Sequence, residues 1–120
     1  MTPADIVKNA ETLLQVGDRS EAECRMVVHA CYYAALHIAA PFVGVDVEKD
    51  HDRHARVREN LQNAAYVGTP PGYVTMLAPY IGDLHKLRVH ADYKLGTHFP
   101  PEKADQAITW MTDVVDAMPK

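Results

Sequence analysis

The sequence predicts an all-α protein, in which residues 1–120 form a single domain: an up-and-down bundle of four main helices and a short fifth. Three observations predict this class. Apolar residues recur at intervals of three and four through most of the chain, which is the period of one helix face. No stretch shows the strict alternation of apolar and polar residues that marks a half-buried strand. A chain of 120 residues can bury one core but is too short for two.

The first two helices have clear starting signals. Thr2 is placed to cap the first helix, Pro3 occupies its first position, and Gly17 ends its apolar repeat. The second helix begins in the sequence SEAE, where Ser20 can cap the helix and Glu23 can reach back to the Ser20 backbone. This reciprocal arrangement, a capping box, is typical of a helix N-terminus.

The second helix is predicted to lie at the centre of the fold. It is apolar almost all round until Pro41 and Gly44 end it, and such a helix has to be covered on every side. Its two cysteines have no CxxC partner and lie two turns apart, too far to bridge, so we expect reduced core residues. The apolar positions follow helical spacing: Cys24, Val27, Val28, Cys31, Ala34, Ala35, Ile38 and Phe42.

Three further helices complete the predicted bundle. A short, charged helix is expected over about residues 50–65, and the sequence GTPPG at 68–72 breaks the chain after it. Apolar spacing resumes from 76 to 95, where Pro79 is expected to begin or kink the helix. Pro101 opens the last helix.

Composition and charge exclude some functional classes. The net charge of −4 argues against a broad nucleic-acid-binding surface, although it allows a local basic groove. The N-terminus lacks a basic segment followed by an apolar run, and no segment approaches the roughly 18 apolar residues of a membrane-spanning helix. We therefore expect a cytoplasmic protein that neither carries a standard export signal nor spans a membrane.

The segment LRVHADYKLG, residues 87–96, concentrates polar groups near the end of a predicted helix. At about 100° per residue, Arg88 falls inside the apolar arc and Asp92 at its edge, whereas Tyr93 falls on the opposite side. A buried arginine needs a partner, and Asp92 can supply one from the next turn. Two interpretations stay open: a structural Arg–Asp pair that fixes the helix register, or an arginine that faces a cleft and holds a phosphate.

The second helix carries a polar line of its own. Arg25, His29 and Tyr32 follow one another at spacings of four and three, with Tyr33 and His37 on other faces. Core tyrosines and a hydrogen-bonded core histidine are the usual explanation for such a line. The same five residues are also candidates for a substrate-binding cleft, because the two longest helices of a bundle normally pack together and the later one carries the arginine.

Seven histidines raise the question of a metal site. Glu48 and His51 have the Glu-x-x-His spacing of a di-iron ligand pair, and His54 follows one turn later, but a di-iron bundle needs two such motifs. We expect no metal and no cofactor, since a glycine-rich phosphate loop is also missing. The segment KDHDRHARVR, 49–58, is expected to be a solvated face, and its arginines form the best local basic patch of the chain: Arg53, Arg56 and Arg58.

Two stretches together resemble a known family. The sequence CYYAALHIA, 31–39, resembles the central helix of HEPN domains, in which a Tyr-Tyr-Ala group is followed by a histidine. The sequence LRVHADYKLG, followed by FPPEKADQAITWM, resembles the end of the same family, where an arginine precedes Ala-Asp-Tyr and a final helix follows. The GDRSEAE segment before the second helix also fits, so the resemblance spans nearly the whole chain.

The resemblance implies a HEPN-like helical bundle that forms homodimers and works beside a minimal nucleotidyltransferase in a toxin–antitoxin pair. Catalytic HEPN proteins are metal-independent endoribonucleases, with an Arg-x(4–6)-His motif contributed by both subunits to a shared cleft. Such chemistry is physically reasonable. A histidine can take the proton from a ribose 2′-hydroxyl, while an arginine stabilises the charge that develops on the phosphate.

This sequence departs from the motif, because the positions where a histidine would follow Arg88 hold Tyr93, Lys94 and Leu95, and His90 comes too early. Two functional hypotheses therefore stay open. One is an RNA-targeting, ribonuclease-type component of a toxin–antitoxin or defence module, with these catalytic residues: Arg88, Asp92, Tyr93 and His90. The other is a non-catalytic HEPN module that binds a nucleotide or a nucleotidyltransferase partner. A helical scaffold or metal-binding bundle outside the family is a third alternative.

A homodimer is also expected from the residues themselves. The second helix is apolar nearly all round, and the side of the later helix that carries Val89 and Tyr93 adds a second apolar surface. One small bundle does not readily bury both of these apolar surfaces. An exposed apolar surface of this kind usually marks an interface, here one with a second copy of the chain.

Overall fold

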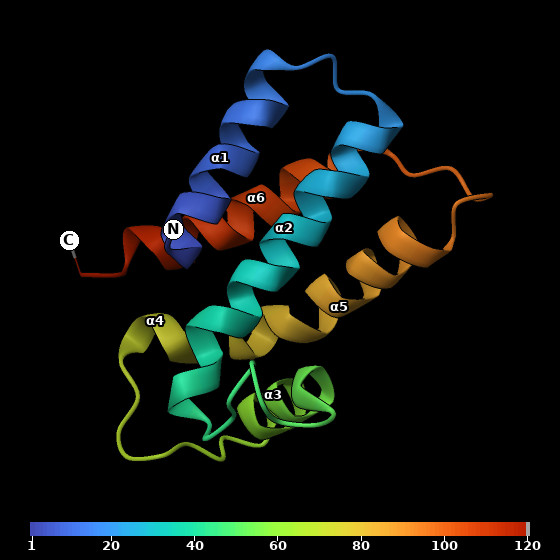
Figure 1. The fold of residues 1–120 in the computed structure, drawn as a ribbon. Helices are drawn as coiled ribbons and strands as arrows, with labels where there is room; N and C mark the ends of the chain where they lie inside the picture. The colour runs from blue at the N-terminus through green and yellow to red at the C-terminus, as the bar shows by residue number, and fades with distance from the viewer. Residues whose placement is uncertain (120) are drawn as a thin grey trace.

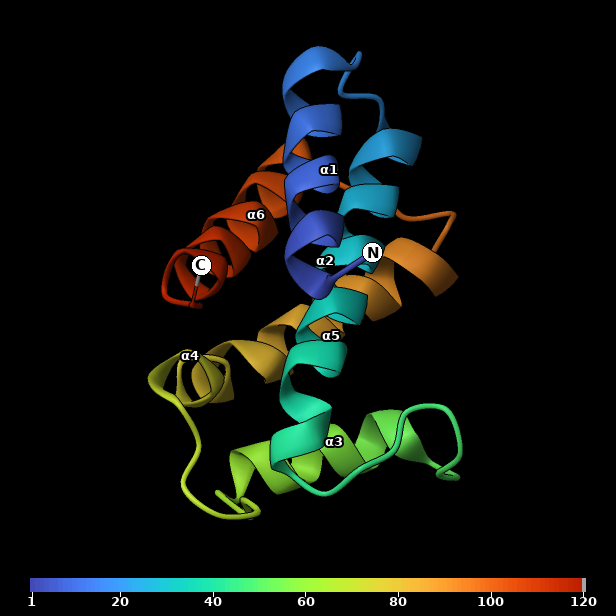
Figure 2. The same ribbon diagram turned by 60° about the vertical axis from the view of Figure 1, so that its left-hand side comes forward.

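The computed structural model describes residues 1–119, and over that range the chain is helical and contains no strand. This confirms the predicted all-α class. Figures 1 and 2 show the arrangement of the helices. Their bounds are α1 Pro3–Val16, α2 Glu21–Ala39, α3 Arg53–Gln62, α4 Gly72–Thr75, α5 Ala78–Tyr93 and α6 Pro101–Asp116, with a 3₁₀ turn, η1 Ala40–Phe42, directly after α2.

Helix α2 is the centre of the molecule, as predicted from its apolar surface. It packs against α1, α3, α5 and α6, and α1 lies beside it in both views. Cys24 and Cys31 are buried and unpaired, and burial raises the pKa of the Cys31 thiol to about 12. Both cysteines are therefore core residues, and the Cys31 thiol stays protonated at neutral pH.

The predicted helix boundaries are partly confirmed. Thr2 caps α1 in a capping box with Asp5, and Pro101 is the first residue of α6. The apolar repeat at 76–95 is shorter as a helix than predicted. Pro79 lies in the first turn of α5 and so begins the helix rather than kinking it, and α5 ends at Tyr93.

One half of the predicted capping box on α2 is wrong. The Ser20 hydroxyl accepts a hydrogen bond from the Glu23 amide at 3.2 Å, as expected. The Glu23 carboxylate does not return to Ser20, because the Arg19 amide donates to it at 3.2 Å, while the Ser20 amide donates to Asp18 at 2.9 Å. Arg19 has a left-handed backbone, φ 55°, and this turn brings its amide to Glu23.

Arg25 joins the start of α2 to the end of α5. Its side chain is only 10% exposed. One guanidinium nitrogen donates to the carbonyl oxygens of His90 and Ala91, both at 2.9 Å, and the other donates to Lys94 at 3.2 Å, to Thr97, and to the Glu21 carboxylate at 2.8 Å. The His90 and Lys94 carbonyls also accept from the Lys94 and Thr97 amides, both at 3.2 Å, whereas the Ala91 and Thr97 carbonyls receive their donors from Arg25. Arg25 therefore fixes where the LRVHADYKLG segment ends.

Replacing Arg25 with methionine is expected to lower the free energy of unfolding by about 3 kcal/mol, because it leaves the buried Ala91 carbonyl and the partly buried Thr97 carbonyl without their donor and removes the ion pair with Glu21. Urea unfolding followed by circular dichroism measures the loss. Arg56→Met is a matched control, since Arg56 is exposed and makes one ion pair, with Asp50 at 3.3 Å. Equal stability of the two variants would contradict the role given to Arg25.

Candidate functional site

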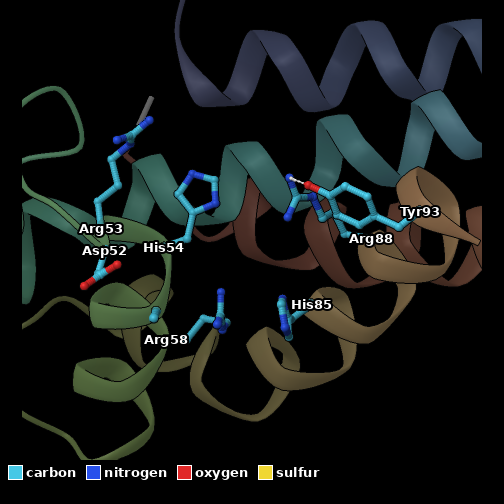
Figure 3. Close-up of a pocket in the computed structure, with 8 residues that line it drawn as sticks. Asp52, Arg53, His54, Arg58, His85, Arg88 and Tyr93 are labelled. Carbon is cyan, nitrogen blue, oxygen red and sulfur yellow. Dashed lines mark hydrogen bonds between the residues drawn. The ribbon is translucent and has the colours of Figure 1, made fainter.

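A cleft of about 480 Å³ opens between α3 and α5. Three arginines and two histidines line it, and Figure 3 shows His54, Arg58, His85 and Arg88 around a common space, with Arg53 extending away from them. We call this the cationic cleft. Its lining consists of Asp52, Arg53, His54, Ala55, Arg58, His85, Arg88 and Tyr93. Four of the eight come from α3 and three from α5, with Asp52 directly before α3.

Helical periodicity places the α3 residues. His54 and Arg58 are four positions apart and share one face, while Val57 and Leu61, on the adjoining part of the helix surface, are buried in the core. The solvated face predicted for this segment is thus correct only in part. Arg56 is exposed, whereas the other basic groups of α3 line the cleft.

Tyr32 forms the floor of the cleft. It is 1% exposed, and its hydroxyl accepts a hydrogen bond from Arg58 Nη1 at 2.7 Å. The His54 and His85 rings lie 6.1 Å and 5.7 Å from the Tyr32 ring, centroid to centroid, and the Arg88 guanidinium carbon lies 5.6 Å from the same centroid. One buried tyrosine on α2 thus supports groups from both walls of the cleft.

Arg88 forms the predicted pair with Asp92 and also lines the cleft. Its Nε donates to Asp92 Oδ2 at 2.8 Å, so the structural pair is present. Its guanidinium also lies 5.2 Å from the Tyr93 ring centroid and lines the cleft, and Nη2 donates to the Tyr93 hydroxyl at 3.4 Å. The Arg88 side chain is 17% exposed, which leaves part of the fork accessible to an anion.

The predicted position of Tyr93 on the opposite side of the helix is wrong. Its Cα lies where the helical wheel places it, but its long side chain reaches back across the last turn of α5 to Arg88 (Figure 3). Because α5 ends at Tyr93, no following turn confines the ring, and the residue is 67% exposed. Tyr93 therefore forms a rim of the cleft.

Both cleft histidines favour their neutral form. Burial, followed by the charges of Arg88, Arg53 and Arg58, lowers the pKa of His54. Burial, followed by the charges of Arg58 and Arg88, lowers the pKa of His85. In addition, His85 Nδ1 is buried without a hydrogen-bond partner, so protonation would add an unpaired buried N–H. A neutral imidazole beside guanidinium groups can accept a proton from a bound substrate.

His90 and Arg25 lie away from the cleft. The His90 ring packs edge-on against Phe99, its Nδ1 is 3.0 Å from Lys103 Nζ, and its Nε2 is buried without a partner. Burial lowers the pKa of His90, and the Lys103 charge adds to this effect. The guanidinium N–H groups of Arg25 already donate to carbonyl oxygens at the end of α5. Neither side chain is placed to meet a ligand in the cationic cleft.

The remaining predicted residues, His29, Tyr33 and His37, lie on α2 and do not line the cleft. His29 Nδ1 is 2.8 Å from Asp92 Oδ2, the same oxygen that accepts from Arg88. Tyr33 and His37 lie along the outer face of α2, with their ring centroids 4.5 Å apart. The structure therefore brings together Arg88 and the following predicted residues: Asp92, Tyr93, Tyr32 and His29.

Sequence reasoning missed the role of His54, Arg58 and His85, and a signal for them was present. His54 and Arg58 have the spacing H-x-x-x-R, and His85 and Arg88 the spacing H-x-x-R. Each spacing places a histidine and an arginine on one helix face. Two such pairs on different helices indicate a cationic site with titratable groups, provided that the helices pack together.

Within residues 1–119, no group of three or more His, Cys, Asp or Glu side chains is placed to hold a metal ion. None of the helices in the same range is long and apolar enough to span a membrane. Comparisons of the chain with family models, with curated proteins and with solved structures found no match.

Proposed function

We propose that this protein is a HEPN-like, metal-independent endoribonuclease with an up-and-down helical-bundle fold, and that it acts in a toxin–antitoxin or defence module. One observation carries the proposal: the neutral imidazole of His54 shares a cleft with the guanidinium groups of Arg58 and Arg88. Arginines recognise the planar oxygens of a phosphodiester, and the imidazole supplies a base.

The proposed reaction uses the ribose itself as the nucleophile. His54 accepts the proton of the 2′-hydroxyl, and the 2′-oxygen then attacks the adjacent phosphorus. Arg88 and Arg58 stabilise the negative charge that develops on the phosphate oxygens. The bond to the 5′-oxygen breaks, leaving a 2′,3′-cyclic phosphate, and the departing oxygen takes a proton from the solvent in the open cleft. In this scheme His54 on α3 replaces the histidine that the HEPN motif has shortly after its arginine.

The quaternary structure and partner belong to the same proposal. Leu13, Met26 and Leu95 are large apolar side chains exposed around α1, α2 and the end of α5, and Met26 lines two apolar hollows there. A second copy of the chain covering this surface is consistent with the homodimer that the resemblance implies. A minimal nucleotidyltransferase is the proposed antitoxin partner, and the cytoplasm the proposed compartment.

A second candidate function is favoured by the pairing of Arg88. Asp92 occupies its Nε and the Tyr93 ring covers part of its fork, so the cleft is suited to holding one phosphate group. A non-catalytic module would bind a nucleotide, or a phosphate-bearing surface of its nucleotidyltransferase partner, in the same place.

Incubation of the purified protein with a mixed RNA pool, with and without a chelator, tests the proposal. We expect cleavage products that end in 2′,3′-cyclic phosphate, at the same rate in both samples, because no step uses a metal ion. Loss of cleavage on chelation would contradict the mechanism. Absence of cleavage together with saturable binding of a nucleotide would favour the non-catalytic function.

A further inference from the structure

An aromatic row lies on the outer face of α2. His29, Tyr33 and His37 follow one another at intervals of four, so their side chains share one helix face. The Tyr33 ring centroid is 4.5 Å from that of His37 and 6.3 Å from that of His29, and the His29 and Tyr33 rings are nearly parallel, at 13°. We call these three residues the aromatic ladder. Tyr32, about 100° further round the helix, is the floor of the cationic cleft.

One end of the aromatic ladder meets the residues of the cleft. His29 Nδ1 lies 2.8 Å from the Asp92 oxygen that also accepts from Arg88. Because Arg88 lines the cleft, Asp92 joins the ladder to it. The ladder also shares helix α2 with Tyr32, whose ring lies beside the His54 and His85 rings.

The open ring of Tyr33 is suited to stacking. Tyr33 is 43% exposed, although it lies between two imidazoles. Unpaired bases of single-stranded nucleic acids stack on aromatic side chains of this kind, beside a positively charged groove that follows the backbone. The arginines of the cleft and the ladder, which are connected through Asp92, supply these two parts.

We propose that the aromatic ladder binds unpaired bases of single-stranded RNA whose phosphate lies in the cationic cleft. This inference rests on the proposed function and adds the form of the substrate. A duplex keeps its bases stacked against one another, so Tyr33 cannot reach them, whereas a single strand can turn its bases outward. One single strand can then place its phosphate against the arginines and stack its base on Tyr33.

Binding of a short, unstructured, fluorescently labelled 2′-O-methyl RNA tests this inference. The methyl group blocks attack by the 2′-oxygen, so binding is measured without cleavage. The affinity of wild type, Tyr33→Ala, Tyr33→Phe, Tyr33→Leu and Arg88→Ala is followed by anisotropy at several salt concentrations, with the duplex form of the same RNA as comparison. Light scattering gives the mass of each variant.

We expect Tyr33→Ala and Tyr33→Leu to bind the single strand about tenfold more weakly, with the salt slope of wild type, because stacking involves no phosphate contact. Tyr33→Phe should bind as wild type does, and the duplex should bind weakly to all five proteins. Arg88→Ala should instead reduce the salt slope by about one, as expected for a lost phosphate contact.

Three results would overturn the inference. If Tyr33→Ala binds the single strand as wild type does while Arg88→Ala does not, the ladder takes no part in binding, and the proposed function stands. If Tyr33→Leu restores the affinity, or Tyr33→Ala changes the oligomeric mass, the ring serves an apolar or subunit contact. If no variant alters RNA binding, both the inference and the proposed function fail.

Discussion

RNA cleavage by the His54→Ala variant is expected to be about 10²- to 10⁴-fold slower than cleavage by the wild-type protein, the usual loss when a general base is removed. Binding of uncleavable RNA should change little, because His54 is neutral and the arginines carry the phosphate contacts. His51→Ala is the matched control, since His51 is exposed, lies three positions earlier and does not line the cleft. Equal losses in both variants, or none in His54→Ala, would contradict the assignment of the base.

The pH dependence of cleavage checks the same assignment independently. Burial and the neighbouring arginine charges lower the pKa of His54 below its ordinary value of 6.5, so the base is neutral at pH 7. The rate should therefore fall only as the pH drops through a midpoint below 6.5. Arg58→Gln removes one of the charges that lower this pKa and should move the midpoint upward. If the midpoint does not move in Arg58→Gln, the fall in cleavage rate at low pH does not arise from protonation of His54.

The helices could be predicted because their signals are local. Thr2, Pro79 and Pro101 mark helix starts through backbone and capping chemistry that depends on a few neighbouring residues, and the structure has helices starting there. The Glu23 error shows the limit of such signals. Which amide a carboxylate reaches depends on the backbone of the preceding turn, and the left-handed conformation of Arg19 was not evident from the sequence.

The site could be predicted only where its residues are close in sequence. Arg88, Asp92 and Tyr93 lie within two turns of one helix, and their association followed from spacing, although the direction of the Tyr93 side chain did not. His54 and Arg58 belong to a charged helix that looks solvated by itself. Their place in the cleft depends on how α3 packs against α2 and α5, which spacing along one helix does not reveal.

Arg25 shows the reverse case. Its position in a polar line on the central helix made it a candidate for the cleft, but the carbonyl groups at the end of α5 accept hydrogen bonds from the same guanidinium. A helix end needs donors for its last carbonyls, and a long arginine from a neighbouring helix supplies them. The sequence contains both groups, yet only the tertiary arrangement shows that they meet.

Replacing Arg88 with alanine is expected to weaken RNA cleavage by about 10²- to 10³-fold while lowering the free energy of unfolding by only about 1–2 kcal/mol. The stability loss is small because Asp92 keeps His29 as a partner and remains partly exposed, so its carboxylate is not left buried and alone. The loss of cleavage is large because the Tyr32 and Tyr93 rings hold the Arg88 guanidinium in place in the cleft. Neither of the other two arginines of the cleft lies between these rings, so neither can replace Arg88 at the phosphate.

Urea unfolding and RNA cleavage measured on the same preparations separate the two interpretations of this helix end. Arg56→Ala is the control for loss of a positive charge, since Arg56 lies on α3 outside the cleft. Arg88→Lys should recover part of the stability but little of the cleavage, because an ammonium group keeps the charge and loses the planar fork that holds two phosphate oxygens. A stability loss of about 3 kcal/mol or more in Arg88→Ala, as for a buried pair that has been broken, together with unchanged RNA and nucleotide binding, would assign Arg88 to the architecture of α5 alone.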